Sequence, residues 1–320
     1  MERILIIKLG AVGDIIMALP AIHRIRLAHP HAEIVILTSR PFEALLNACP
    51  DVDRVDASAR SGRAFESLRL ARAILNEGYA LIYDLQASAG TRRLLAALRL
   101  VALTGAGRLP RWSGPFRGVS DPAPDLDRSA VRAQDRHAAQ LDVAGLPTAA
   151  APRLAPDMAW LADGSTIELP QGPYALLIPG ASPGGGAKRW SEAGYAALAA
   201  ELRERGLTPV VLGGPEDPGL GRRILASTPG GADMVGRTSL ADIAALARGA
   251  RVAVGNDTGP THLAAAMGAP TLLLVSDVSA SALAQPFDTI RPLHRPSLAQ
   301  LGVKPVVEAL SQLLAREVTS

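Results

Sequence analysis

The sequence has 320 residues, of which 48% are hydrophobic and 20% charged, and its formal net charge is +3. At about 100–200 residues per domain this length predicts two domains, and the apolar content is sufficient for a core in each. The composition excludes a disordered or collagen-like chain, the single cysteine cannot form an internal disulfide, and 3% aromatic residues argue against nucleic-acid binding. Because Lys8 interrupts the first apolar run and prolines interrupt the longest one, we expect a soluble cytoplasmic protein without a signal peptide or membrane span.

Short apolar strands alternate with helical patterns along the chain. In the first half the expected strands are Ile4–Ile7, Glu33–Leu37 and Leu81–Asp84, and the expected helices lie near Ile15–Leu27, Ala64–Asn76 and Thr91–Ala102. In the second half the expected strands are Ala175–Ile178, Pro209–Leu212, Arg251–Val254 and Thr271–Val275, with helices near Glu192–Arg205, Leu240–Ala247, Thr261–Met267 and Val303–Ala315. This alternation is typical of parallel sheets covered by helices on both faces and joined by right-handed crossovers.

The alternation lapses between Gly145 and Gly172, where Pro, Ala and Asp dominate and Met158–Leu161 could add a short strand. We interpret this stretch as a linker between an α/β domain over residues 1–150 and a second over residues 151–320. Ligands of open α/β sheets bind outside the carboxyl ends of the strands. The loops that follow the strands are therefore the places to look for chemistry.

The loop Lys8–Asp14 follows the first strand and contains Gly10 and Gly13. Its G-x-x-G spacing differs from the dinucleotide fingerprint, and a carboxylate at the start of the next helix would repel a phosphate. Two readings of Asp14 stay open. It caps the helix, which is the commonest role of Asp at such a position, or it is a general base exposed at the cleft.

The loop Pro179–Trp190 holds several glycines with Ser182 and Lys188 after a strand. Backbone N–H groups, a hydroxyl and a cation together suit a phosphate cradle, although the loop is not a Walker A motif and a flexible surface turn is an equal alternative. Glu216 follows another strand, where an acid either accepts hydrogen bonds from a ribose or only starts a helix.

The loop Gly255–His262 follows an apolar strand and opens an Ala-rich helix. Pro260 fits the first helical turn, where its missing N–H is harmless. The N–H groups of Thr258 and Gly259 with the Thr258 hydroxyl predict an anion site, and Asp257 is placed to accept hydrogen bonds from sugar hydroxyls. His262 either faces the ligand or packs in the core, and we expect no metal site because no metal-ligand spacing occurs.

The segment Ala87–Ser120 contains six arginines and no acidic residue. Such a local positive field attracts anions. The segment is therefore either a solvated arginine-rich face or a contact for an anionic lipid or a phosphorylated acceptor.

Taken together, these loops resemble those of the glycosyltransferase family 9 heptosyltransferases, which assemble the inner core of lipopolysaccharide. The similar stretches are I-L-I-I-K-L-G-A-V-G-D-I-I-M-A-L-P-A-I at 4–22, I-P-G-A-S and A-K-R-W within 178–190, V-V-L-G-G-P-E-D at 210–217, and G-N-D-T-G-P-T-H-L-A-A-A at 255–266. They cover nearly the whole chain in the same order.

The resemblance implies a GT-B fold, in which two Rossmann-like domains face each other across a cleft. It implies an acceptor in the N-terminal domain and a nucleotide sugar, typically ADP-heptose, in the C-terminal one, with the last helix able to pack back on the N-terminal domain. Carried over by position, Asp14 is the catalytic base, Ser182 and Lys188 hold the diphosphate, and Glu216 holds the ribose. Asp257, Thr258, Gly259 and His262 then contact the sugar and phosphates, and the tentative acceptor-binding residues are Gly13, Arg92, Arg93 and Arg111.

The resulting hypothesis is an inverting, metal-independent glycosyltransferase that needs no cofactor besides its substrate. It would transfer a sugar to a lipopolysaccharide core or related glycan, with peripheral contact to the cytoplasmic face of the inner membrane. One alternative is a catalytically silent binding or scaffolding relative. The other is an NAD(P)-dependent oxidoreductase, which would require a G-x-G-x-x-G loop that the first loop lacks.

Overall fold

The computed structural model describes residues 1–58, 64–127, 130–146, 158–181, 186–279 and 287–317. The chain divides into two compact units, with the division between residues 154 and 155. Each unit contains one six-stranded sheet in which every strand is parallel to its neighbours.

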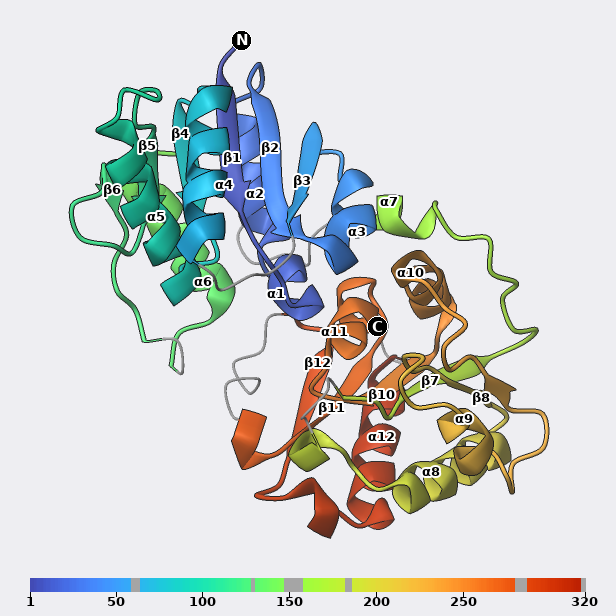
Figure 1. Cartoon of the computed structure of the whole chain (residues 1–320). Helices are drawn as coiled ribbons and strands as arrows, with labels where there is room; N and C mark the ends of the chain where they lie inside the picture. The colour runs from blue at the N-terminus through green and yellow to red at the C-terminus, as the bar shows by residue number, and fades with distance from the viewer. Residues whose placement is uncertain (59–63, 128–129, 147–157, 182–185, 280–286, 318–320) are drawn as a thin grey trace. The chain divides into compact units, whose positions relative to one another are not determined.

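The sheet of the first unit has the strand order β3-β2-β1-β4-β5-β6 (Figure 1). Its strands are β1 Arg3–Ile7, β2 Glu33–Ser39, β3 Arg54–Ser58, β4 Leu81–Asp84, β5 Arg111–Gly114 and β6 Asp121–Pro122. The helices are α1 Val12–Ile16, α2 Leu19–Ala28, α3 Glu43–Asn47, α4 Ala64–Glu77, α5 Ala89–Ala102 and α6 Ala133–Val143, with a 3-10 turn η1 at Arg40–Phe42.

Helices cover both faces of this sheet because successive strand side chains point to opposite faces. Leu5 and Leu37 share one buried cluster with Ile74 of α4 and Leu98 of α5. Figure 1 shows α4 in front of the strands and α2 behind them, and α6 packs beside α2. The apolar residues of each strand are therefore buried on both sides, as expected for a parallel sheet.

The second unit repeats this arrangement with the order β12-β11-β10-β7-β8-β9. Read from β9 to β12, with β7 counted as the first strand, this order is the same as that of the first sheet. Its strands are β7 Tyr174–Ile178, β8 Thr208–Val211, β9 Ala232–Asp233, β10 Val252–Asn256, β11 Thr271–Val275 and β12 Ile290–His294. The helices are α7 Ala159–Ala162, α8 Glu192–Glu204, α9 Leu220–Ile224, α10 Leu240–Gly249, α11 Gly259–Ala266 and α12 Val303–Glu317, with 3-10 turns η2 Gly186–Lys188 and η4 Leu298–Gln300.

The expected architecture of two Rossmann-like parallel sheets is confirmed, while some of its elements differ locally from the expected ones. The helix expected over Ile15–Leu27 is two helices, because Pro20 has no N–H to continue the bonding pattern of α1. The short strand considered at Met158–Leu161 is wrong, since α7 occupies that stretch. Leu310 of the last helix, α12, joins the core cluster of the second unit that contains Leu272, and the expectation that this helix can also pack on the N-terminal domain stays a prediction.

In the described part of the chain, no helix combines the length and the apolar character that crossing a membrane requires.

Candidate functional site

Both sheets have the strand order of dinucleotide-binding folds, in which the direction of strand addition reverses between two central strands. In the first unit these strands are β1 and β4, and in the second they are β7 and β10. A crevice opens at the carboxyl ends of such a pair and is the usual ligand site. Three of these four strands, β1, β7 and β10, lead into the loops that the sequence singled out at Lys8–Asp14, Pro179–Trp190 and Gly255–His262.

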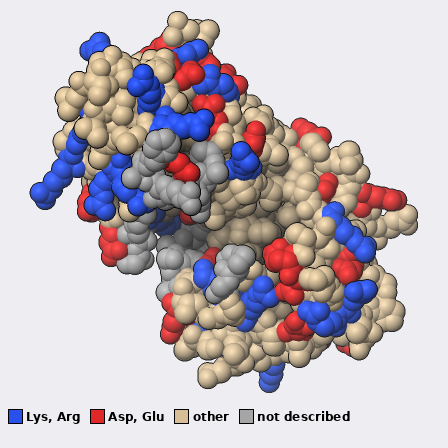
Figure 2. All heavy atoms as spheres, viewed as in Figure 1, with Lys and Arg blue, Asp and Glu red and all other residues tan. Residues whose placement is uncertain are grey.

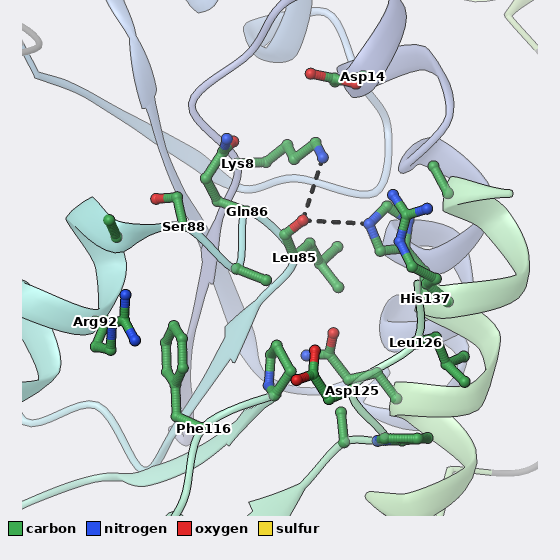
Figure 3. Close-up of a pocket in the computed structure, with 18 residues that line it drawn as sticks. Lys8, Asp14, Leu85, Gln86, Ser88, Arg92, Phe116, Asp125, Leu126 and His137 are labelled. Carbon is green, nitrogen blue, oxygen red and sulfur yellow. Dashed lines mark hydrogen bonds between the residues drawn. The ribbon is translucent and has the colours of Figure 1, made fainter. Parts of the chain in front are cut away.

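The first unit has a pocket of about 300 Å³ at the carboxyl ends of β1 and β4 (Figure 3). The first residues of α5 and one side of α6 complete its wall. Its charged lining residues are Lys8, Arg92, Arg136, Asp14 and Asp125. The three cations exceed the two carboxylates, so the pocket favours a ligand that carries negative charge and hydroxyl groups.

Asp14 is exposed and lines this pocket, on the same side as Lys8 in Figure 3. Its Oδ2 accepts a hydrogen bond of 3.1 Å from the backbone N–H of Ala11, so the carboxylate does cap α1. Capping and exposure to a ligand are compatible, because a carboxylate has two oxygens and several lone pairs. The two readings of Asp14 from the sequence therefore do not exclude each other.

The backbone ahead of Asp14 requires glycine at position 10. Gly10 has a φ of +110°, which side chains rarely adopt, and a Cβ there would lie 2.1 Å from Cε2 of Phe42. Ser39 donates a hydrogen bond of 2.7 Å to the carbonyl of Leu9. These contacts hold the loop against the end of β2.

The carbonyl of Leu85, directly after β4, joins two buried basic side chains at the pocket. It accepts hydrogen bonds of 3.2 Å from Lys8 Nζ and 3.2 Å from His137 Nε2 (Figure 3). Burial, together with the nearby charge of Lys8, lowers the pKa of His137 to about 3. The imidazole is therefore neutral and carries its proton on Nε2, which leaves Lys8 as the cation of this pair.

Asp84, the last residue of β4, directly precedes the pocket residue Leu85 and is fully buried. Its Oδ1 accepts hydrogen bonds from the N–H groups of Gln86 (3.2 Å) and Ala87 (2.8 Å), and Ala87 has a φ of +47°. Burial raises the pKa of Asp84 to about 6 despite these hydrogen bonds. The turn also directs Gln86 to the first loop, where its Oε1 accepts a 2.9 Å hydrogen bond from the Leu9 N–H.

In the second unit, Asp257 joins two of the expected donor-binding residues. Its Oδ2 lies 2.8 Å from Lys188 Nζ, and its Oδ1 lies 2.9 Å from His262 Nε2. Burial alone would raise the pKa of Asp257, but the hydrogen bonds from His262 and Lys188 outweigh it and lower this pKa below its ordinary value. Asp257 is therefore ionised, and it holds the ammonium group of Lys188, from the loop after β7, beside the loop after β10.

The helix α11 begins next to this cluster, with Thr258 as its N-cap and Gly259 as its first residue. The side chain of Thr258 makes no capping hydrogen bond to this helix, and its Oγ1 instead lies 3.1 Å from Thr261 Oγ1. The N-terminal end of a helix carries partial positive charge and free donors. Lys188 and this helix end together form an electropositive site that suits a phosphate.

Asn256, which was not predicted from the sequence, forms hydrogen bonds to both ends of the loop Pro179–Trp190 that carries Lys188. This fully buried amide donates from Nδ2 to the carbonyls of Pro179 (2.8 Å) and Gly180 (3.2 Å). Its Oδ1 accepts from the Trp190 N–H (3.1 Å) and the Tyr195 hydroxyl (3.0 Å). All its hydrogen-bonding groups are used within the protein, so its role is to position its neighbours.

The remaining expected residues lie in different surroundings. Glu216 is exposed and its carboxylate lies over Gly214, where a Cβ would come within 2.1 Å of Oε2. Its neighbour Asp217 forms an ion pair of 2.6 Å with Arg189. Ser182 lies outside the described residues.

Of the four residues expected to bind the acceptor, Arg92 lines the pocket. Gly13 and Arg93 are not among its described lining residues. Arg111 lies at the amino end of β5, where it forms an ion pair of 2.8 Å with Asp121, and is not brought to the pocket. Sequence position alone could not separate these arginines, because the segment that carries them turns through a helix and a strand.

Comparisons with known proteins give the family and the fold of the chain. The family model described as glycosyltransferase family 9 (heptosyltransferase) matches residues 67–280. The chain is 25% identical over 296 residues to lipopolysaccharide heptosyltransferase 2 of Salmonella typhimurium, covering 85% of this chain and 82% of that protein. It is 28% identical over 286 residues to lipopolysaccharide heptosyltransferase 1 of Pseudomonas aeruginosa, covering 85% and 78%.

The fold is similar to that of the E. coli ADP-heptose lps heptosyltransferase II, with a TM-score of 0.74, 23% identity and 99% of both chains covered. The E. coli heptosyltransferase WaaC with ADP gives a TM-score of 0.75 at 19% identity, with 97% of this chain and 99% of that chain covered. These likenesses confirm the GT-B fold class. Because the family model matches two thirds of the sequence, the chain belongs to glycosyltransferase family 9 and is a glycosyltransferase of the heptosyltransferase type.

Proposed function

We propose that this glycosyltransferase transfers a heptose from ADP-heptose to a lipopolysaccharide core or a related glycan. The observation that carries the proposal is the cluster of Lys188, Asp257 and His262 beside the uncapped start of α11. A nucleoside diphosphate needs positive charge and N–H donors, while a sugar needs acceptors for its hydroxyls. The cluster offers both at the carboxyl ends of β7 and β10.

In this proposal the diphosphate of the donor lies between Lys188 and the first N–H groups of α11, with Ser182, Thr258 and Gly259 as further contacts. Asp257 accepts hydrogen bonds from the sugar hydroxyls, His262 lies beside the sugar and orients this carboxylate by donating from Nε2 to Oδ1, and Glu216 binds the ribose. Lys188 has three N–H donors, of which one reaches Asp257, so others are left for phosphate oxygens. Among the solved relatives are E. coli heptosyltransferase WaaC with ADP or with ADP-2-deoxy-2-fluoro heptose, and heptosyltransferase TibC in complex with ADP-D-beta-D-heptose, which supports an adenine nucleotide here.

The acceptor binds in the pocket of the first unit, where Arg92 and Lys8 attract an anionic glycan. Asp14 acts as general base: it takes the proton of an acceptor hydroxyl while that oxygen bonds to the anomeric carbon. The bond between this carbon and the diphosphate oxygen breaks on the opposite face, so the configuration inverts and ADP leaves. General base catalysis of this kind is typically worth about 10²–10⁴-fold in rate.

Stabilisation of the leaving diphosphate is the second part of the mechanism. Negative charge grows on the diphosphate as its bond to the sugar breaks, and Lys188 with the α11 N-terminus faces that charge. One well-placed donor contributes about 10²–10³-fold. The residues of this chain supply the charge, so the proposal includes no metal ion. We place the reaction in the cytoplasm, where nucleotide sugars are made.

The test combines binding with transfer. A thermal-shift panel of ADP, UDP, GDP and ADP-heptose should show the largest stabilisation with the adenine nucleotides, since a ligand at 100 times its dissociation constant adds about 2.7 kcal/mol of stability. Transfer of labelled heptose from ADP-heptose to a deacylated core oligosaccharide is then measured by mass spectrometry. A preference for UDP or GDP, or binding without any transfer, contradicts the proposal.

A further inference from the structure

A second surface of the first unit, outside the pocket, combines arginines with exposed leucines. Along α5 and the turn that follows it, the exposed side chains include Arg93, Arg99, Leu100, Leu103, Arg108 and Leu109, which we name the arginine–leucine surface. The exposed fractions of Leu100, Leu103 and Leu109 are 58%, 85% and 42%. Large apolar side chains at such exposure within ten residues are unusual on a protein that meets only water.

The charge around these leucines has one sign. No acidic residue occurs from Ala87 to Ser120, and the adjacent helix α4 adds the exposed Arg69 and Arg72. The two acids of α4 are Glu66 and Glu77, and Glu77 pairs with Arg3 and Arg54. In Figure 2 several Lys or Arg side chains project from the flank of the unit where Figure 1 places α5. Among the described residues, no carboxylate forms an ion pair with Arg93 or Arg108.

We propose that the arginine–leucine surface binds the surface of an anionic phospholipid bilayer. Leucines of this kind insert at the boundary between headgroups and acyl chains, while arginines extend their guanidinium groups to the lipid phosphates. A second copy of this chain fits less well, because a symmetric contact would bring the same arginines together. Nucleic acid fits less well too, because leucines offer no stacking surface for bases.

The surface is also well placed relative to the pocket. Helix α5 begins at the pocket, which Ser88 and Arg92 line, and is about 21 Å long at 1.5 Å per residue over its 14 residues. Leu100 lies in its last turn and Leu103 directly follows it. A bilayer bound along this helix would therefore lie near the pocket without occupying it. The inference does not depend on the donor, so it stands or falls separately from the proposed activity.

The experiment is sedimentation of the full chain with vesicles, without any donor or acceptor. The vesicles consist of phosphatidylcholine alone or of phosphatidylcholine and phosphatidylglycerol in equal parts, at low and at high salt. We expect binding to the mixed vesicles only, weakened by salt because the attraction of exposed charges is screened. Absence of binding, or equal binding to both kinds of vesicle, overturns the proposal.

Two double variants test which residues are responsible. Arg93→Glu/Arg108→Glu should weaken binding by about 25-fold or more, because each basic side chain near an anionic surface contributes about fivefold. Leu100→Ser/Leu103→Ser should weaken it by about tenfold or more, because the buried apolar area is lost. The matched control is Leu27→Ser/Val143→Ser, which removes two exposed apolar side chains from α2 and α6 on the opposite face of the sheet.

The control should bind vesicles as the unchanged protein does, and all three variants should keep their thermal unfolding temperature because the substituted side chains are exposed. Equal vesicle binding by the leucine variant and the unchanged protein overturns the proposal. So does a loss of vesicle binding by the control as large as that of the leucine variant. Size-exclusion chromatography shows whether the protein is a monomer or a dimer. A dimer that does not bind vesicles would assign the surface to self-association and overturn the proposal.

Discussion

Lys188 and Asp257 lie 69 residues apart in the sequence and form an ion pair of 2.8 Å between Nζ and Oδ2. Each belongs to a loop that leaves a central strand of the second sheet, and β7 and β10 are paired in register. The ion pair therefore depends on the sheet, and it places the cation beside the start of α11. This relationship leads to the first prediction.

Lys188→Ala should weaken ADP binding by about 10–100-fold, because a hydrogen bond to a charged group is worth about 1.5–3 kcal/mol. The rate of transfer should fall further, because the same charge faces the leaving diphosphate. Isothermal titration with ADP measures the first effect and a transfer assay the second. Lys304→Ala, which removes an exposed lysine from α12, is the control, and equal ADP affinity of the two variants would contradict the role of Lys188.

Asp14→Asn should reduce transfer by about 10²–10⁴-fold while ADP affinity stays within about twofold of the unchanged protein. The amide can still accept the hydrogen bond from the Ala11 N–H, so the cap of α1 is retained and only the base is lost. Single-turnover kinetics with ADP-heptose and acceptor provide the measurement. A fully active Asp14→Asn protein would remove Asp14 from the mechanism.

Asn256→Asp should weaken ADP binding although residue 256 contacts no ligand in the proposed site. The new carboxylate oxygen would face the carbonyls of Pro179 and Gly180, so two donated hydrogen bonds are replaced by repulsion. We expect an ADP affinity lower by about tenfold or more with an unchanged KM for the acceptor.

Tyr195→Phe is the milder control, since it removes one hydroxyl from the same amide at a cost of about 1 kcal/mol. If Asn256→Asp lowered the affinity for donor and acceptor equally, the amide would serve general stability rather than the position of the Lys188 loop.

Asp84 should make the stability of the first unit depend on pH. Its pKa is raised from 3.8 to about 6, so the contribution of this group is fully present below pH 4 and is lost as the pH rises through about 6. A rise of about two pKa units corresponds to about 3 kcal/mol. Asp84→Asn should therefore gain stability relative to the unchanged protein between pH 4 and pH 7.

Urea unfolding at several pH values measures this difference, and Asp125→Asn controls for the removal of an exposed carboxylate beside the same pocket. The imidazole of His137 acts in the opposite direction, but both proteins carry it, so it does not affect the comparison. A stability difference that is constant from pH 4 to pH 7 would show that Asp84 is not the buried acid described above.

Gly10→Ala should destabilise the first unit by about 2–5 kcal/mol, because the methyl group meets the Phe42 ring and the backbone keeps a positive φ. Combining it with Phe42→Ala removes the collision and leaves the backbone strain. The double variant should therefore recover part of the stability beyond the sum of the single effects, as a thermal-unfolding double-mutant cycle would show. Strict additivity would mean that the ring does not restrict this position.

The alternation of strands and helices, and the loops that carry the chemistry, could be predicted from the amino-acid sequence alone. Runs such as Ile4–Ile7 and Thr271–Val275 are apolar on both faces, and that local property reports burial in a parallel sheet. The placement of Asp14, Lys188 and Asp257 after strands was predicted for the same reason. Strands such as β5 and β12 were missed because arginine, serine, glycine or proline interrupts their apolar pattern.

Which side chains contact each other could not be predicted in this way, because it depends on how distant segments pack. The pairing of Lys8 and His137 through the Leu85 carbonyl joins β1, the end of β4 and α6. Asn256 bonds to the carbonyl of Pro179, which lies 77 residues earlier in the chain. Periodicity describes each segment separately, whereas these contacts depend on strand order and register between segments far apart in the chain. The same reason brought Arg92 to the pocket and left Arg111 at the other end of its strand.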